Sequence, residues 1–276
     1  MPGSHRCAMS EPRGCVSRMD IATSADGTPI AYTATGDGPV VVIVNGALSL
    51  AVDAASLAAA LVDAGFRAVT WDRRARGSSG DARDSAPDRE AEDLAAVIAA
   101  IGGDAAVLGH SSGAVLALFA ASRGVPIRAL FLSEPPFGFG ATEAPEDLAD
   151  RLQHLVDAGR LDEAITTFQL ESVRLPQQMV DQIRASDEFA ALLPLAQSTV
   201  YDTRLVAQVS TPTAEMLAVT MPVTVLRGEQ TFPVLIAGSD RLANAIPDAE
   251  LVIVPESVMH RADPVATARV IGERLP

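Results

Sequence analysis

The chain has 276 residues, of which 48% are hydrophobic and 4% aromatic, and its formal net charge at pH 7 is −14. This length suits one large domain, or one domain with an insertion, and the hydrophobic content is ample for a buried core. The negative charge argues against binding to nucleic acid or anionic membranes, and no apolar run is long enough to span a bilayer. We therefore expect neither a nucleic-acid nor a membrane partner.

The first residues differ from the rest of the chain. Residues 1–18 carry basic side chains but lack the apolar segment of a secretory signal, so they predict a disordered extension on a cytoplasmic protein. Cys7 and Cys15, the two cysteines, both lie there and have no partner set for a disulfide framework. The four histidines show no close pairing, and we expect no metal and no cofactor.

Apolar, β-branched runs alternate with helical patterns along the first half of the chain. Strands are predicted at 30–35, 40–44, 68–71, 105–108 and 128–132, and helices at 54–64, 89–101 and 112–121. Gly65 follows the first helix as a stop signal, as Gly102 and Gly103 follow the second. The run Val40–Val44 is apolar throughout, which is typical of a strand buried on both faces.

This alternation stops after about residue 136. Residues 137–219 show helical patterns only, for example Leu148, Leu152 and Leu155 at helical spacing. Alternation returns with strands at 223–226 and 251–254, a helix around 241–246, and a last helix that begins at Asp263-Pro264. The sequence predicts an α/β fold with a doubly wound, mostly parallel sheet, built from 19–136 and 220–276, with 137–219 as a helical cap over the carboxyl ends of the strands.

One motif indicates chemistry. Gly109-His110-Ser111-Ser112-Gly113 directly follows a buried strand and opens a helix, which is the strand-turn-helix setting of a nucleophile elbow. The serine of such a turn is strained, and bulkier residues two positions away would collide with neighbouring backbone. The helix N-terminus also points free N–H groups at a developing oxyanion. Ser111 is the predicted nucleophile.

A serine nucleophile needs a base and an acid that orients the base. Of the histidines, His260 follows the last strand in a loop that can return over Ser111, and it is the predicted base. The usual acid position, after the strand 223–226, holds Thr231, which cannot carry a charge. Glu134 follows the strand 128–132, beside the elbow strand in the expected sheet order, and is the predicted acid. The alternatives for this acid are Glu229, Asp240 and Asp263.

Two further turns lie near these residues in the predicted sheet. Asn45-Gly46-Ala47 follows the buried strand 40–44. We expect the backbone N–H groups of Ala47 and Ser112 to form the oxyanion hole. Alternatively, Asn45-Gly46 forms only a tight turn, which these two residues also favour. The basic stretch Asp72–Gly80 is punctuated by glycine but lacks a Walker pattern. We interpret it as a structural turn held by arginine hydrogen bonds.

Together these motifs resemble the α/β-hydrolase superfamily from about Met19 to the C-terminus. Asp72–Gly80 looks like its glycine-rich turn after the fourth strand, Gly109–Gly113 like its elbow, and His260 like its base. The combination with Glu134-Pro135-Pro136 is similar to a group of actinobacterial hydrolases. The position of the acid is similar to that of one haloalkane dehalogenase branch, whose nucleophile is aspartate, so Ser111 argues against dehalogenation.

Three functions fit these residues. The first is a serine hydrolase that cleaves an ester, thioester, lactone or amide of a small apolar molecule through an acyl-enzyme on Ser111. The second is a non-hydrolytic enzyme of the same fold, a cyclase, isomerase or lyase of secondary metabolism, with His260 as base. The third is a receptor of the same fold that binds a ligand without turnover. The complete set of Ser111, Glu134 and His260 favours the first.

Overall fold

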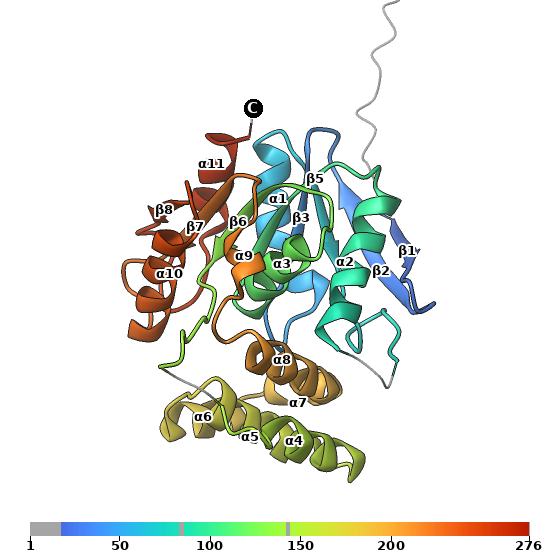
Figure 1. Cartoon of the computed structure of the whole chain (residues 1–276). Helices are drawn as coiled ribbons and strands as arrows, with labels where there is room; N and C mark the ends of the chain where they lie inside the picture. Colours follow the sequence, from blue (N-terminus) through green and yellow to red (C-terminus); the bar gives the residue numbers. More distant parts are fainter. Residues whose placement is uncertain (1–17, 83–85, 142–143, 276) are drawn as a thin grey trace, which may run out of the picture.

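The computed structural model describes residues 18–82, 86–141 and 144–275. Its sheet has the order β1-β2-β4-β3-β5-β6-β7-β8 (Figure 1). Strands β3 to β8 pair in parallel, whereas β1 and β2 add an antiparallel edge. The predicted doubly wound, mostly parallel sheet is therefore confirmed. The strands are β1 (Met19–Thr23), β2 (Pro29–Thr35), β3 (Val40–Val44), β4 (Arg67–Trp71), β5 (Ala105–His110), β6 (Ile127–Ser133), β7 (Val223–Arg227) and β8 (Glu250–Ile253).

Helices connect the strands and also form one long insertion between β6 and β7. The helices are α1 (Ala55–Asp63), α2 (Pro87–Ala100), α3 (Ser112–Ser122), α4 (Leu148–Asp157), α5 (Leu161–Thr167), α6 (Gln177–Arg184), α7 (Phe189–Leu192), α8 (Ala196–Gln208), α9 (Ala214–Leu217), α10 (Pro233–Ala245) and α11 (Pro264–Gly272). Short 3₁₀ turns precede α1 and α8, and a π-helical turn extends α5 over Phe168–Ser172.

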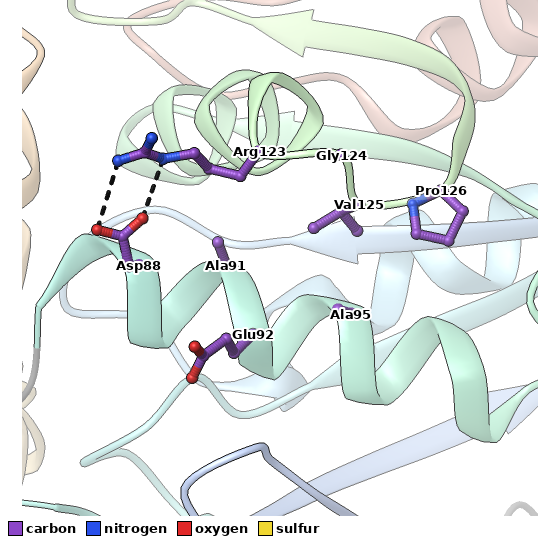
Figure 2. A pocket seen from close by; sticks show the side chains of 8 residues that line it. All are labelled: Asp88, Ala91, Glu92, Ala95, Arg123, Gly124, Val125 and Pro126. Carbon is purple, nitrogen blue, oxygen red and sulfur yellow. Dashed lines mark hydrogen bonds and ion pairs between the residues drawn. The ribbon is translucent and has the colours of Figure 1, made fainter.

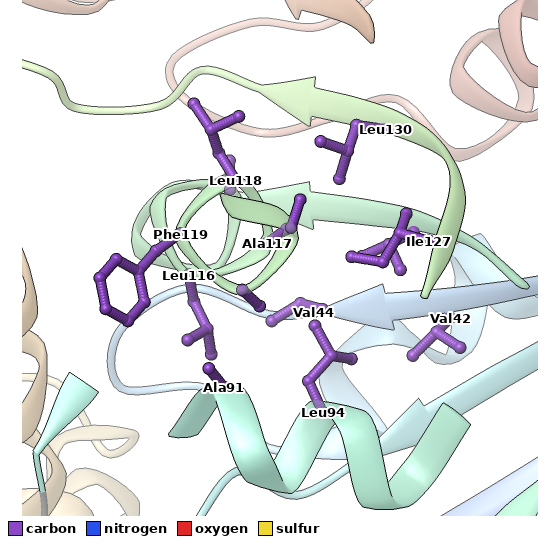
Figure 3. Close-up of a cluster of buried hydrophobic side chains, with 14 of the residues drawn as sticks. Val42, Val44, Ala91, Leu94, Leu116, Ala117, Leu118, Phe119, Ile127 and Leu130 are labelled. Atoms are coloured by element: carbon purple, nitrogen blue, oxygen red, sulfur yellow. The ribbon is translucent and has the colours of Figure 1, made fainter. Parts of the chain in front are cut away.

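The sheet is buried on both faces, which explains the continuous apolar runs. Along β3, Val42 and Val44 point to the face covered by α2, α3 and α10, whereas Val41 and Ile43 point to the face covered by α1 and α11. Figure 3 shows the first of these cores, where Leu94 of α2 and side chains of α3 meet β3 and β6. Because each strand contributes alternate residues to each face, both faces require apolar side chains.

The helical insertion, defined here as α4 to α8, forms a separate layer at one end of the sheet (Figure 1, olive to brown). Its own apolar core includes Leu148, Leu152, Ile165 and Phe168, and Ala47 and Leu48 of the turn after β3 pack against that core. The insertion therefore covers the end of the sheet at which the parallel strands terminate.

The structure differs from the sequence analysis at three places. Strand β1 was not predicted, because it is an edge strand with an exposed Met19 and Ile21. Helix α10 begins at Pro233, well before the predicted 241–246; Gly238 interrupts its pattern, and a Cβ there would lie 2.8 Å from the Phe137 carbonyl oxygen. Helices of the insertion begin at Leu148 rather than near residue 137.

The predicted extension, apart from residue 18, lies outside the described residues, as do Cys7 and Cys15. No helix within the described part of the chain has the length and apolar character needed to cross a bilayer.

Candidate active site

The predicted site residues follow strands whose carboxyl ends lie side by side. In the parallel register, His110 of β5 pairs with Ser133 of β6, which pairs with Leu226 of β7. Ser111 and Glu134 directly follow the last residues of β5 and β6, so the register alone places their backbones at one edge of the sheet. This is the edge at which parallel α/β sheets bind ligands.

Ser111 lies in a strained turn. Its φ is 55° and its ψ is −126°, between the last residue of β5 and the first of α3. A left-handed φ costs a non-glycine residue about 1–3 kcal/mol, so the surroundings must hold it in place. The Ser111 N–H donates to the Ser133 carbonyl at 2.9 Å, and Gly46 lies so close that a Cβ there would be 2.9 Å from the Ser111 Cβ.

The two glycines of the motif are required by backbone contacts. A Cβ on Gly109 would lie 2.5 Å from the Gly113 carbonyl oxygen, and a Cβ on Gly113 would lie 2.1 Å from the Val44 carbonyl oxygen. Side chains at these two positions therefore have no room between β5, α3 and β3.

Gly113→Ala is therefore expected to destabilise the fold by about 3 kcal/mol, because the new methyl group overlaps the Val44 carbonyl oxygen of the central strand β3. Urea unfolding followed by circular dichroism measures this loss. Gly272→Ala is the matched control: its Cβ would meet only a Phe66 ring carbon at 3.8 Å, and alanine is the better helix former, so about 0.5 kcal/mol should be gained. Equal stability of the two variants would contradict the prediction.

The structure brings Glu134 and His260 into direct contact. The His260 Nδ1 lies 2.5 Å from the Glu134 Oε2. The carboxylate is buried, with 4% of the side chain exposed, whereas 25% of the histidine side chain is exposed. Glu134 also accepts hydrogen bonds from the Gly228 N–H at 2.9 Å and from the Thr231 hydroxyl at 3.0 Å. Thr231, at the position where an acid was first sought, thus orients the carboxylate that is present.

These contacts determine which groups carry protons. Burial opposes ionisation of Glu134, but the hydrogen bonds from His260, Gly228 and Thr231 outweigh it and hold the pKa of this carboxyl below its usual range. An ionised carboxylate only accepts hydrogen bonds, so the His260 Nδ1 must carry the hydrogen. In the neutral imidazole, Nε2 then keeps the lone pair and can accept a proton.

The loop that carries His260 is fixed by contacts with the β7–α10 turn. Val258 forms an isolated bridge with Gln230, and the Met259 N–H donates to the Gln230 carbonyl at 2.8 Å. His260 itself has a φ of 62°, and Glu134 has a φ of 48°. All three predicted catalytic residues therefore have left-handed backbone conformations, and strain of this kind clusters at functional sites.

His110 contacts the predicted base, a role the sequence analysis did not assign. The two imidazole rings have centroids 4.6 Å apart, and the His110 Nδ1 lies 3.2 Å from the Ser133 hydroxyl. Burial and the nearby His260 lower the pKa of His110 to about 3, so its ring is neutral beside His260 at ordinary pH. This contact also places the His260 ring next to the residue that precedes Ser111.

The predicted oxyanion donors lie at two free backbone positions. Among the described residues, the N–H groups of Ala47 and Ser112 have no backbone acceptor. Ser112 is the first residue of α3, where N–H groups lack a partner within the helix. Gly46, next to Ala47, is in van der Waals reach of Ser111. The two donors therefore belong to segments that meet at the elbow.

The interpretation of Asp72–Gly80 as a turn held by arginine hydrogen bonds is confirmed. The Arg76 guanidinium donates to the Gly46 carbonyl at 2.6 Å, and Arg73 binds Glu90 at 2.7 Å. The Asp72 carboxylate accepts from the Ser78 N–H at 2.9 Å. Each arginine is buried, so each requires a carboxylate partner inside the protein.

The alternative acids have other partners or positions. Asp240 forms an ion pair with Arg227, with 2.6 Å between Oδ1 and Nε, and Asp263 caps α11 by accepting from the Ala266 N–H at 2.8 Å. Glu229 is exposed. Of the four acids considered, Glu134 is the one that the structure places against His260.

A search of the described residues for metal ligands finds no group of three His, Cys, Asp or Glu side chains that could hold an ion. A surface hollow of about 500 Å³ lies between α2 and the turn Arg123–Pro126 and is crossed by the Asp88–Arg123 ion pair (Figure 2). It contains none of the predicted site residues, so the strand ends around Ser111 remain the candidate site.

Comparisons with known proteins agree with this architecture. Residues 41–270 match the model of the Alpha/beta hydrolase family. A crystal structure of an alpha/beta hydrolase from Sphaerobacter thermophilus is 38% identical, with a TM-score of 0.85 over 92% of this chain and 99% of that chain. A sequence search of curated proteins gave no match.

More distant structures share the fold. A thermophilic esterase from Thermogutta terrifontis has a TM-score of 0.68 at 19% identity, over 93% of this chain and 96% of that chain. The epoxide hydrolase VrEH1 from Vigna radiata has a TM-score of 0.66 at 19% identity, over 93% and 95%. On the sequence match and the shared fold, the chain belongs to the Alpha/beta hydrolase family.

Proposed function

We propose that this protein is a serine hydrolase that cleaves an ester, thioester, lactone or amide of a small apolar molecule through an acyl-enzyme on Ser111. The observation that carries the proposal is the 2.5 Å contact of Glu134 with His260, whose ring packs beside the strained elbow. A buried carboxylate on the His260 Nδ1, with the imidazole ring packed on the residue that precedes the elbow serine, supports a catalytic triad of Ser111, His260 and Glu134.

The reaction follows from these positions. The Ser111 Oγ attacks the substrate carbonyl carbon and passes its proton to the His260 Nε2, while Glu134 stabilises the imidazolium that forms. The N–H groups of Ala47 and Ser112 hold the oxyanion. His260 then protonates the leaving group. Water next attacks the acyl carbon and gives a proton to His260, which returns it to the Ser111 Oγ as the acid product leaves.

Labelling with a fluorophosphonate probe tests the proposal. We expect one adduct, located on Ser111 by peptide mass spectrometry, because only an activated serine reacts at an appreciable rate. The adduct should be absent in Ser111→Ala and His260→Ala and slower to form in Glu134→Gln. His154→Ala changes an exposed histidine of α4 and is the matched control, which should label like the wild type.

An unlabelled but folded protein would contradict the proposal. The non-hydrolytic enzyme and the ligand-binding receptor would then be the better hypotheses. Labelling at a different serine would also contradict it, because the predicted triad would not be the reactive centre.

A further inference from the structure

A buried cluster of four charges lies directly behind the predicted oxyanion hole. Asp202 of α8 binds Arg73 at 2.9 Å and Arg76 at 2.6 Å, and Glu90 of α2 binds Arg73 at 2.7 Å. All four side chains are at most 2% exposed. Two cations and two anions balance, and one of the anions comes from the helical insertion rather than from the core.

The same cluster holds both segments that supply the oxyanion donors. Arg76 donates to the Gly46 carbonyl at 2.6 Å, and Arg73 lies 3.3 Å from the Asn45 carbonyl. The C=O and N–H of a planar trans peptide point in opposite directions. Fixing the Gly46 carbonyl on Arg76 therefore also fixes the direction of the Ala47 N–H.

Asp202 reaches the second segment directly. Its Oδ1 accepts a hydrogen bond from the Ser112 hydroxyl at 2.7 Å, at the first residue of α3. Burial opposes ionisation of Asp202, but Arg73, Arg76 and the Ser112 hydroxyl outweigh it and keep its pKa below the usual range. One ionised carboxylate thus joins the two arginines to the N-terminus of α3.

We propose that Asp202 is a positioning residue for the oxyanion hole of the function proposed above. It contacts no reacting atom. It neutralises the arginines that hold the turn after β3 and anchors Ser112, so the two N–H groups take their catalytic directions when α8 lies on the core. The insertion, in this view, completes the oxyanion hole as well as covering the site.

The test uses Asp202→Asn in the full-length protein, with p-nitrophenyl butyrate as substrate. Asparagine keeps the volume but leaves one buried guanidinium charge without a partner and turns an N–H₂ group toward an arginine. We expect kcat to fall about 10- to 100-fold with KM within about twofold, because the oxyanion exists in the transition state and not in the bound ester. The midpoint of the acid limb of the rate should not move, since the Glu134–His260 pair is intact.

An alkyl trifluoromethyl ketone gives an independent readout. The Ser111 Oγ adds to its carbonyl carbon, the carbonyl becomes an oxyanion in the hole, and the serine proton passes to His260. Its inhibition constant should rise in Asp202→Asn by about the factor lost in kcat/KM, because both measure the same oxyanion contacts.

Tyr201→Phe is the matched control. Tyr201 is the neighbouring residue of α8 and donates to the Asp81 carboxylate at 2.8 Å, so the variant removes another polar contact between this helix and the core. Its kcat should stay within about twofold of the wild type. Equal losses of kcat in the two variants would show that only the packing of α8 on the core matters, and would overturn the inference. An unchanged kcat in Asp202→Asn would also overturn it.

Three further outcomes are decisive. If Asp202→Asn does not fold, Ser112→Ala removes the hydroxyl link while keeping every charge, and kcat should fall about three- to tenfold; a wild-type rate would overturn the inference. If the wild-type protein neither hydrolyses the ester nor labels at Ser111, the proposed function falls and this inference with it. Wild-type activity combined with a normal kcat in Asp202→Asn would overturn the inference alone.

Discussion

His260→Ala is expected to lower kcat about 10⁶-fold, because alanine leaves Ser111 with no group to take its proton. The fold should be little affected, since a quarter of the histidine side chain is exposed and the ring contacts mainly His110 and Glu134. Steady-state rates with p-nitrophenyl butyrate, measured on protein whose circular dichroism matches the wild type, give the value.

The nonadditivity of the triad provides the control. Ser111→Ala combined with His260→Ala should be no slower than either single variant, because the two residues act as a unit. His154→Ala, which changes an exposed residue of α4, should keep the wild-type rate. A kcat within tenfold of the wild type in His260→Ala would rule out this histidine as the base.

Glu134→Gln is expected to lower kcat about 10⁴-fold while leaving the packing nearly unchanged. Glutamine still accepts from the Gly228 N–H, but its N–H₂ group can face the His260 Nδ1 and favour the tautomer with hydrogen on Nε2. That tautomer cannot accept the serine proton. Rates of ester hydrolysis measure the loss.

The matched control for this acid is Asp240→Asn. It removes the α10 carboxylate that pairs with Arg227 of β7, and kcat should stay within about twofold of the wild type. A larger loss in Asp240→Asn than in Glu134→Gln would assign the acid to the alternative residue.

The pKa of Glu134 also determines how it affects stability with pH. Because its pKa is lower in the folded protein than the ordinary value of 4.5, ionised Glu134 stabilises the fold. This contribution is complete above pH 4.5 and is lost as pH falls through the lower, folded-state pKa.

The parts of the fold predicted from sequence are those in which local pattern and tertiary burial agree. The run Val40–Val44 is apolar at every position because both faces of β3 are covered, and such a run has no other stable location. Edge strand β1 buries only Ala22 of its five residues, so no such pattern marks it. Gly238 in α10 likewise reflects a contact with the Phe137 backbone that is distant in sequence.

The candidate site was predictable in part for a similar reason. Gly109 and Gly113 flank Ser111 because backbone of β3 and α3 occupies the space of any side chain, so the local motif reports a tertiary contact. Glu134 and His260 could be predicted as partners because both follow parallel strands, whose ends must meet at one edge of the sheet. The five site residues were predicted from the sequence alone, and their catalytic roles stay predictions.

The contacts of Asp202 and His110 were decided by the tertiary structure alone. Asp202 lies 129 positions from Arg73 along the chain. The sequence pattern of its helix indicates only that one side is apolar. No local pattern predicts which core residue Asp202 contacts. His110 has a position in the elbow motif that fixes its backbone but not its contact with His260. The sequence by itself determined the sheet and the turn at Ser111, and it predicted the order of nucleophile, acid and base, because these follow from short-range spacing and strand polarity. Only the tertiary structure decided that Asp202 of the insertion pairs with Arg73 and Arg76 of the core. This pairing depends on how the insertion packs on the sheet, and the sequence pattern of neither layer reports it.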